Sequence, residues 1–438
     1  MERVFAERAD FRRKVLFAVW GIARSALDKG WMMRLAQPVF GLFHPFHPEF
    51  RRDPYPFYRR LREEAPVYFS PVFRGWILSR HADVERVLRD PRFSVERERA
   101  DFFRKLDLLG GVRPEFAEAL RRNLLMLDPP AHTRLRRLVS QAFTPRRVEE
   151  LRPKVEALVE ELLDRMARHD EVEFIESFAY PLPVAVIAEL LGVPTEDRDR
   201  FKTWSDALTA VLDPLQAPDG LGPAERAFAE LSEYFRHALE TRRREPRDDL
   251  LGVLARADES GDRLSEVEIL SLCMLLLAAG HETTTNLLAN ALLAFARFPG
   301  EARRLRKDPS LAPLAVEECL RYTSPIQLTD RVALEDLEIG GHRIRKHQLV
   351  GLLLAAANRD PEIFPDPDRL DVTRDPNPHL AFGQGTHFCL GAHLARLEAQ
   401  IALPALFRRF PDLHVDPRVE YRRSMVLRAP ASLRVRLS

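Results

Sequence analysis

The sequence predicts a mainly α-helical protein with a minor β region, folded as one large domain around an enclosed ligand. Apolar residues recur with the helical period of about 3.6 over four long segments, whereas strand signals are short and clustered. No repeat, low-complexity tract or linker divides the 438 residues. A chain of this length buries roughly three quarters of its unfolded surface, which is enough for a core with a ligand inside it.

Proline and glycine separate the four helical segments, so each is expected to form a helix of its own. The third begins with a capping-box pattern, in which Ser265 precedes Glu268 by three residues. Its roughly thirty residues would cross the whole domain at about 1.5 Å per residue. The four segments are Leu151–Met166, Ala224–Arg243, Ser265–Phe298 and Leu311–Tyr322.

Strand signals are few and lie in three short parts of the chain. Val67–Phe69 and Trp76–Leu78 flank a turn that contains proline and glycine. Leu337–Ile344 is expected to fold back across Gly340 and Gly341 as a hairpin. Alternating apolar residues at 433, 435 and 437 predict a final strand.

The charge balance excludes a protein held mainly by nucleic-acid phosphates. Lysine plus arginine number 67 and aspartate plus glutamate 66, so the formal net charge is only +1. The three cysteines are odd in number and far apart, which favours a reducing compartment over a disulfide framework. We therefore expect a cytoplasmic protein.

Cys389 lies in the segment with the most specific pattern, Phe382-Gly-Gln-Gly-Thr-His-Phe-Cys-Leu-Gly391. A helical pattern follows it, so the sulfur is expected at a helix N-terminus, where the helix dipole lowers the pKa of a thiol. Gly391 has no Cβ and would let a flat macrocycle approach the helix closely. Two other interpretations are open: a buried structural cysteine, or a small metal site made from His387, Cys389 and His393.

The middle of the third helix carries an acid next to an alcohol, Glu282 and Thr283, in an otherwise apolar run. A threonine hydroxyl can hydrogen bond to the carbonyl four residues earlier, here Ala279, and open a small groove. Such a pair suits the delivery of protons to a bound molecule by general acid–base catalysis. The alternative is that the threonine is only a small residue at a helix crossing and Glu282 a salt-bridged core acid.

Together these patterns resemble the cytochrome P-450 family. Phe382, Gly385, Cys389 and Gly391 match its cysteine-loop signature in identity and spacing, and the segment 279–284 is similar to its Ala/Gly-Gly-x-Asp/Glu-Thr-Thr/Ser motif. The resemblance implies the fold of the soluble bacterial members, haem b as cofactor and Cys389 as the ligand of the iron. It argues against peroxide-driven relatives, in which arginine and proline replace the acid and the alcohol.

The likeness runs from about Phe46 to the C-terminus, which makes residues 46–438 the haem domain. Residues 1–45 are then an N-terminal extension with an amphipathic helix behind a cationic flank. Its apolar run, Val15–Ala23, is too short to span a bilayer. The extension is expected either to pack on its own domain or to make weak contact with a membrane surface.

The resemblance also implies roles for residues whose own patterns are weak. The residues expected to contact the haem or its propionates are His132, Arg136, Ala279, Gly280, Arg331, Phe382, His387, Cys389 and Gly391. Glu318 and Arg321, three apart on one helix face, resemble the family's structural Glu-x-x-Arg pair. Arg369 is expected to complete that cluster, with Arg374 as the other candidate.

The implied activity is that of a haem-thiolate monooxygenase, which inserts one atom of O2 into a lipophilic small molecule by hydroxylation or epoxidation. Electrons would come from a ferredoxin and its NAD(P)H-dependent reductase. Other functions left open are a non-catalytic haem-binding sensor, a peroxide-using haem-thiolate enzyme, and a haem-free metal- or lipid-binding helical protein. Arginines that could form a docking patch for an acidic ferredoxin are Arg134, Arg137, Arg146, Arg147 and Arg396. Segments expected to form the substrate pocket are 93–125, 201–221, 325–328 and 425–427.

Overall fold

The computed structural model describes residues 41–437 except 46, 72, 107–111, 210, 212, 214–220, 248, 258–263 and 417. The predicted helix of the N-terminal extension lies outside these residues. The helices are α3 (Pro48–Arg52), α4 (Tyr55–Glu64), α5 (His81–Arg89), α6 (Asp101–Leu106), α7 (Pro114–Arg121), α8 (Ala131–Ser140), α9 (Pro145–Glu149), α10 (Arg152–Met166), α11 (Pro181–Leu191), α12 (Arg198–Thr209), α13 (Gly222–Arg244), α14 (Leu250–Ala257), α15 (Glu266–Arg297), α16 (Pro299–Lys307), α17 (Ala312–Tyr322), α18 (Leu354–Ala357) and α19 (Ala392–Arg409). The strands are β1 (Val67–Ser70), β2 (Gly75–Leu78), β3 (Phe93–Ser94), β4 (Glu171–Glu173), β5 (Thr329–Ala333), β6 (Leu337–Ile339), β7 (His342–Ile344), β8 (Leu349–Leu352), β9 (His414–Val415) and β10 (Arg434–Arg436).

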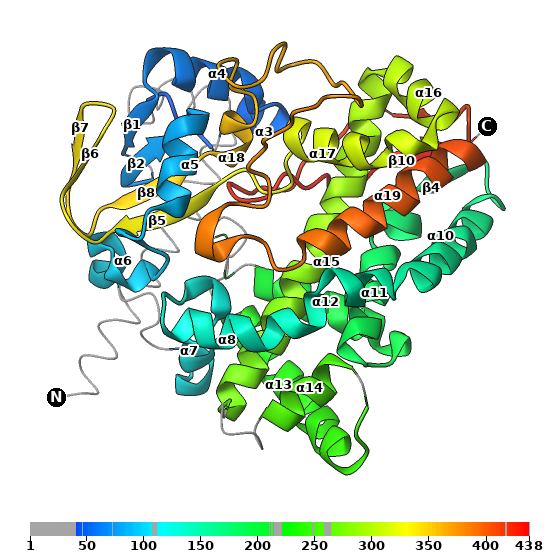
Figure 1. Cartoon of the computed structure of the whole chain (residues 1–438), viewed down its shortest axis with the longest axis horizontal. Helices are drawn as coiled ribbons and strands as arrows, with labels where there is room; N and C mark the ends of the chain where they lie inside the picture. The colour runs from blue at the N-terminus through cyan, green and yellow to red at the C-terminus, as the bar shows by residue number, and fades with distance from the viewer. Residues whose placement is uncertain are drawn as a thin grey trace.

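The long helix α15 forms the centre of the helical part, with α11, α12, α13 and α19 packed against it (Figure 1). Its predicted capping box is confirmed, because Ser265 accepts from the Glu268 N–H while Glu268 accepts from the Ser265 N–H. Among the described residues it is the one helix whose length and apolarity would suit a membrane span, but 72% of that window is buried in the protein. The helix is therefore explained as the core of the fold.

A five-stranded sheet lies beside the helices, in the order β1-β2-β8-β5-β3 (Figure 1). β2 and β8 pair in parallel and the other neighbours are antiparallel. A second sheet has the order β4-β10-β9, and β6 and β7 form a separate hairpin. The first sheet places Arg331, on β5, at the cavity described below.

The structure confirms the four predicted helices and the predicted strands, with ends shifted by three residues or fewer. The confirmed strands are the β1–β2 pair, the β6–β7 hairpin and the last strand. The sequence did not reveal β8, because all four of its residues are buried and a strand buried on both faces has no apolar–polar alternation. The domain boundary at residue 46 stays a prediction. Phe43 is buried, with its ring 5.7 Å from that of Phe50, so the packed core includes residues before 46.

Candidate functional site

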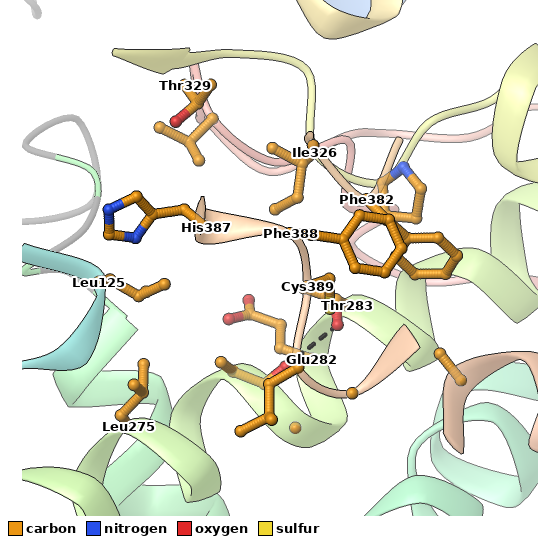
Figure 2. Close-up of a pocket in the computed structure, with 18 of the residues that line it drawn as sticks. Leu125, Leu275, Glu282, Thr283, Ile326, Thr329, Phe382, His387, Phe388 and Cys389 are labelled. Atoms are coloured by element: carbon orange, nitrogen blue, oxygen red, sulfur yellow. Dashed lines mark hydrogen bonds between the residues drawn. The ribbon is translucent and has the colours of Figure 1, made fainter. Parts of the chain in front are cut away.

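A cavity of about 350 Å³ lies between the middle of α15, the cysteine loop, α8 and the sheet. All of the predicted catalytic and cofactor-binding residues line it, although they come from four separate parts of the chain. Figure 2 shows the loop that carries His387, Phe388 and Cys389 together with Glu282 and Thr283 of α15. The predicted lining residues are His132, Arg136, Ala279, Gly280, Glu282, Thr283, Arg331, Phe382, His387, Cys389 and Gly391.

The cysteine loop is held by its backbone. The Cys389 N–H donates to the carbonyl of Phe382 at 2.9 Å, and Gly391 is the N-cap residue of α19. Gly385 has φ of +70°, and a Cβ there would lie 2.7 Å from the Leu88 carbonyl oxygen, so both conformation and space require glycine. The loop therefore places the sulfur before the first turn of α19, as predicted.

The sequence predicts a lowered pKa for the Cys389 thiol, and this prediction is wrong for the free thiol. Burial raises this pKa, and the Gly391 N–H together with the charges of Arg136 and Arg396 oppose the rise without cancelling it. A coordinating metal ion deprotonates a thiol outright, so the thiolate depends on the bound ion rather than on the helix terminus alone.

The predicted side-chain hydrogen bond is present in the middle of α15, within a continuous helix. Thr283 donates its hydroxyl hydrogen to the Ala279 carbonyl at 3.0 Å, the bond dashed in Figure 2. Gly280 lies against α11, where an added Cβ would come within 3.0 Å of the Ile187 side chain. A hydroxyl that is bonded to a neighbouring carbonyl keeps its oxygen lone pairs available to a further donor.

Glu282, next to Thr283, is held by residues that sequence reasoning missed. Its Oε2 accepts from the Thr209 hydroxyl at 2.8 Å, and its Oε1 lies 3.7 Å from an Nη of Arg422. Burial raises the pKa of Glu282, while the Thr209 hydrogen bond and the Arg422 charge act in the opposite direction. Thr209 and Arg422 are 73 residues before and 140 residues after Glu282 in the sequence, so no local spacing could have linked them to it.

Four cationic or protonatable side chains meet at one edge of the cavity. The rings of His132 and His387 are in contact, with centroids 4.2 Å apart and planes tilted by 51°, and Nδ1 of His132 is buried without a described hydrogen-bond partner. No described carboxylate forms an ion pair with Arg136 or Arg331, whose pKa values are both lowered, mainly by burial. Burial, and then the charges of His132, Arg331 and Arg136, lower the pKa of His387 to about 3.

These groups fit a flat dianionic cofactor such as haem. Buried arginines without carboxylate partners are costly unless an anion is bound, and two propionates supply that charge. A Cβ on Gly391 would meet no atom within 4 Å, so the face of the loop toward the cavity is open. The described residues contain no group of three or more His, Cys, Asp and Glu side chains that could hold a metal ion, so the His387–Cys389–His393 alternative loses its support.

Arg97 and Asp330 also line the cavity and were not predicted. Their side chains form an ion pair at 2.7 Å, next to Arg331 on β5. Each is an ordinary charged residue in its local sequence, and the pairing of β3 with β5 brings the turn that carries Arg97 next to Asp330.

The Glu-x-x-Arg pair is buried as predicted, but its third member is different. Arg321 binds both carboxylate oxygens of Glu318 at 2.7 and 2.8 Å, and both side chains are fully buried. The guanidinium of Arg374 completes the cluster, with Nε 3.1 Å from Glu318 Oε2. Arg369 is exposed and contributes only its backbone carbonyl, which accepts from Arg321. Its side chain was therefore wrongly assigned to the cluster.

The predicted arginine patch is partly used inside the protein. Arg396 binds both oxygens of Glu317 at 2.7 Å and lies over the ring of Phe382, so it supports the cysteine loop. Arg134 forms an ion pair with Glu268. These two arginines have internal partners that the sequence alone did not indicate.

Comparison with known proteins agrees with this geometry. A family model described as cytochrome P-450 matches residues 68–435. Cytochrome P-450 107B1 of Saccharopolyspora erythraea is 44% identical over 401 residues, covering 89% of this chain and 96% of that protein. The 6-deoxyerythronolide B hydroxylase of the same organism is 43% identical over 402 residues, covering 89% and 97%. The solved structure of P-450BioI in complex with a hexadec-9Z-enoic acid ligated acyl carrier protein has a TM-score of 0.82 at 40% identity, covering 89% of this chain and 99% of that chain.

Proposed function

Because this chain belongs to the cytochrome P-450 family, we propose that its cavity holds haem b with Cys389 as the thiolate ligand of the iron. The protein is a haem-thiolate monooxygenase, which inserts one atom of O2 into a lipophilic small molecule. The observation that carries the site assignment is the meeting of Cys389 with the unpaired cations Arg136 and Arg331 around one cavity. Haem, when bound, supplies the dioxygen chemistry, and a thiolate ligand favours cleavage of the O–O bond.

In this proposal the propionates are bound by His132, Arg136, Arg331 and His387. We expect Arg136→Leu to weaken haem retention by about tenfold, because a charge-assisted hydrogen bond is lost. Transfer of haem to apomyoglobin measures retention. The matched control is Arg137→Leu, on the same helix but exposed. Equal haem loss from the two variants would contradict the anchor assignment.

We assign proton delivery to Glu282 and Thr283, the acid and the alcohol of α15. The Thr283 hydroxyl, which lines the cavity, holds and passes a proton, and Glu282 replenishes it from the side of Thr209 and Arg422. The rival interpretation, a core acid beside a small residue, gives neither side chain a role in turnover.

Glu282→Gln and Thr283→Ala test this assignment. With a compound selected by its ferric spin-state change, each should lower product formed per NADH by about a hundredfold, with hydrogen peroxide released instead. Thr283→Ser keeps the hydroxyl and should restore most of the coupling. Normal coupling in both Glu282→Gln and Thr283→Ala would leave the rival interpretation standing.

Separate redox partner proteins supply the electrons to this enzyme, and we infer that they are a ferredoxin and its NAD(P)H-dependent reductase. The exposed arginines on α8 and α9 are the candidates for docking, since Arg134 and Arg396 are only partly exposed. Arg137→Glu with Arg147→Glu should slow reduction by a ferredoxin about tenfold at low salt, with the difference shrinking as salt rises. Reduction rates that match those of the wild type at every ionic strength would exclude this surface.

The domain assignment is also a proposal: residues 46–438, together with the buried Phe43 segment, form the haem domain, and the rest of 1–45 is an extension.

The similarity to soluble bacterial relatives supports a cytoplasmic location. All four predicted pocket segments contribute to the cavity wall, and the apolar lining residues, which come from three of these segments, support a lipophilic substrate. These contributions are Val95, Leu124 and Leu125, then Thr209 and Asp213, then Pro325, Ile326 and Leu328, and finally Val426 and Leu427.

A further inference from the structure

The Glu282 carboxylate is held by two segments that do not belong to its own helix. The hydroxyl of Thr209, the last residue of α12, donates to one carboxylate oxygen at 2.8 Å, and the Ser205 carbonyl oxygen, at 2.9 Å, is the other acceptor for the same hydrogen. Arg422, in the segment between β9 and β10, lies 3.7 Å from the other. The Glu282 side chain is 12% exposed and that of Arg422 is 38% exposed, so Arg422 lies between the buried acid and solvent.

The same two segments are joined by a second buried acid. Asp213, fully buried beyond the end of α12, accepts from the Ser424 hydroxyl and from the backbone N–H of Met425 at 2.9 Å and of Val426 at 3.3 Å. Thr209, Asp213 and Val426 also line the cavity. A molecule bound in the cavity therefore touches the segments that hold Glu282.

We propose that Thr209 and Arg422 are positioning residues that hold the Glu282 carboxylate in place. Asp213 in turn fixes the segment that carries Arg422 against α12. This rests on the proposed role of Glu282 in proton delivery. A shift of either segment by one ångström would remove Thr209 or Arg422 from its oxygen, and a misplacement of that size is sufficient to impair proton transfer. A molecule that fills the cavity thus affects the position of Glu282, because the same segments line the cavity and hold the carboxylate.

The charges around Glu282 agree with this role. Arg422 lies within 4.0 Å of Asp206 on α12, so the guanidinium bridges two carboxylates. Asp206 and Asp213 raise the pKa of Glu282, in the same direction as burial, whereas Thr209 and Arg422 lower it. Removing either positioning group takes away one of the two influences that favour the charged carboxylate, so the pKa of Glu282 should rise further.

The first test needs no turnover. The infrared carbonyl band of Glu282, identified by subtraction of the Glu282→Gln spectrum, is followed against pH in the resting holoenzyme. Thr209→Val and Arg422→Gln should each shift the frequency of the band and raise the pH at which half of its intensity is lost. Thr209→Ser should restore both. The matched controls are Thr203→Val, an exposed threonine of α12, and Arg418→Gln, an arginine whose ion pair with Asp416 is exposed.

The second test measures coupling with dodecanoic acid as the probe. Thr209→Val and Arg422→Gln should raise hydrogen peroxide released per NADH about tenfold, since the first loses a hydrogen bond to the carboxylate and the second loses its ion-pair partner. An unchanged band and midpoint in both variants would overturn the proposal. If the variants shift the band but Glu282→Gln itself keeps normal coupling, the positioning stands and the proposed function of Glu282 fails.

Discussion

Replacing Cys389 with serine is expected to abolish both thiolate ligation and monooxygenase turnover. The sulfur lies at the cavity, and the loop around it is fixed by the Cys389 N–H bond to Phe382 and by Gly385, neither of which uses the sulfur. The fold should therefore survive the substitution. A hydroxyl donates far less electron density to iron than a thiolate does, so O–O cleavage loses its driving group.

The control for this prediction comes from the other two cysteines, Cys273 and Cys319. Both are fully buried in the helical core, and burial raises the pKa of each thiol. Cys273→Ala and Cys319→Ala should keep the absorption spectrum and turnover, with only a small loss of stability. Substrate turnover and the optical spectrum are measured in all three variants. Retention of both in Cys389→Ser would refute the assignment of the iron ligand.

Glu318→Ala is expected to destabilise the protein by about 3–5 kcal/mol, the cost of leaving buried charges without their partner. Arg321 has no exposed surface, and Arg374 reaches the same carboxylate from the segment after β8. The Asp371 N–H also donates to Glu318, so the carboxylate ties that segment to α17. Denaturant unfolding of the holoenzyme measures the loss.

Arg369→Ala is the matched control, because its side chain is exposed and only its carbonyl accepts from Arg321. It should change the free energy of unfolding by no more than about 0.5 kcal/mol. Arg374→Ala should instead cost several times more. If Arg369→Ala were as damaging as Arg374→Ala, the position of the third arginine in this cluster would be wrong.

Features that depend on local spacing could be predicted from the sequence. The Thr283–Ala279 hydrogen bond and the Glu318–Arg321 pair both follow from helix geometry, with partners four and three residues apart. The family resemblance also allowed residues far apart in the sequence to be assigned to one site, as with Cys389 and Arg331. Both line the same cavity in the structure.

The partners of Glu282 could not be predicted, since Thr209 and Arg422 meet it only when α12 and the C-terminal segment have packed on α15. The choice of Arg374 over Arg369 likewise depends on how a loop turns, and both are arginines in the same stretch of sequence. The prediction that the pKa of the Cys389 thiol is lowered was wrong for another reason. Burial outweighs the helix terminus, and the sequence does not give the extent of burial.

The central claim is that the iron of the bound haem is coordinated by the sulfur of Cys389. The most direct test is the absorption spectrum of the purified holoenzyme, reduced and saturated with carbon monoxide. A strongly red-shifted Soret band is the result expected of an iron with a thiolate ligand. A Soret band at the position typical of a histidine-ligated carbonyl complex, in freshly prepared protein, would contradict the claim.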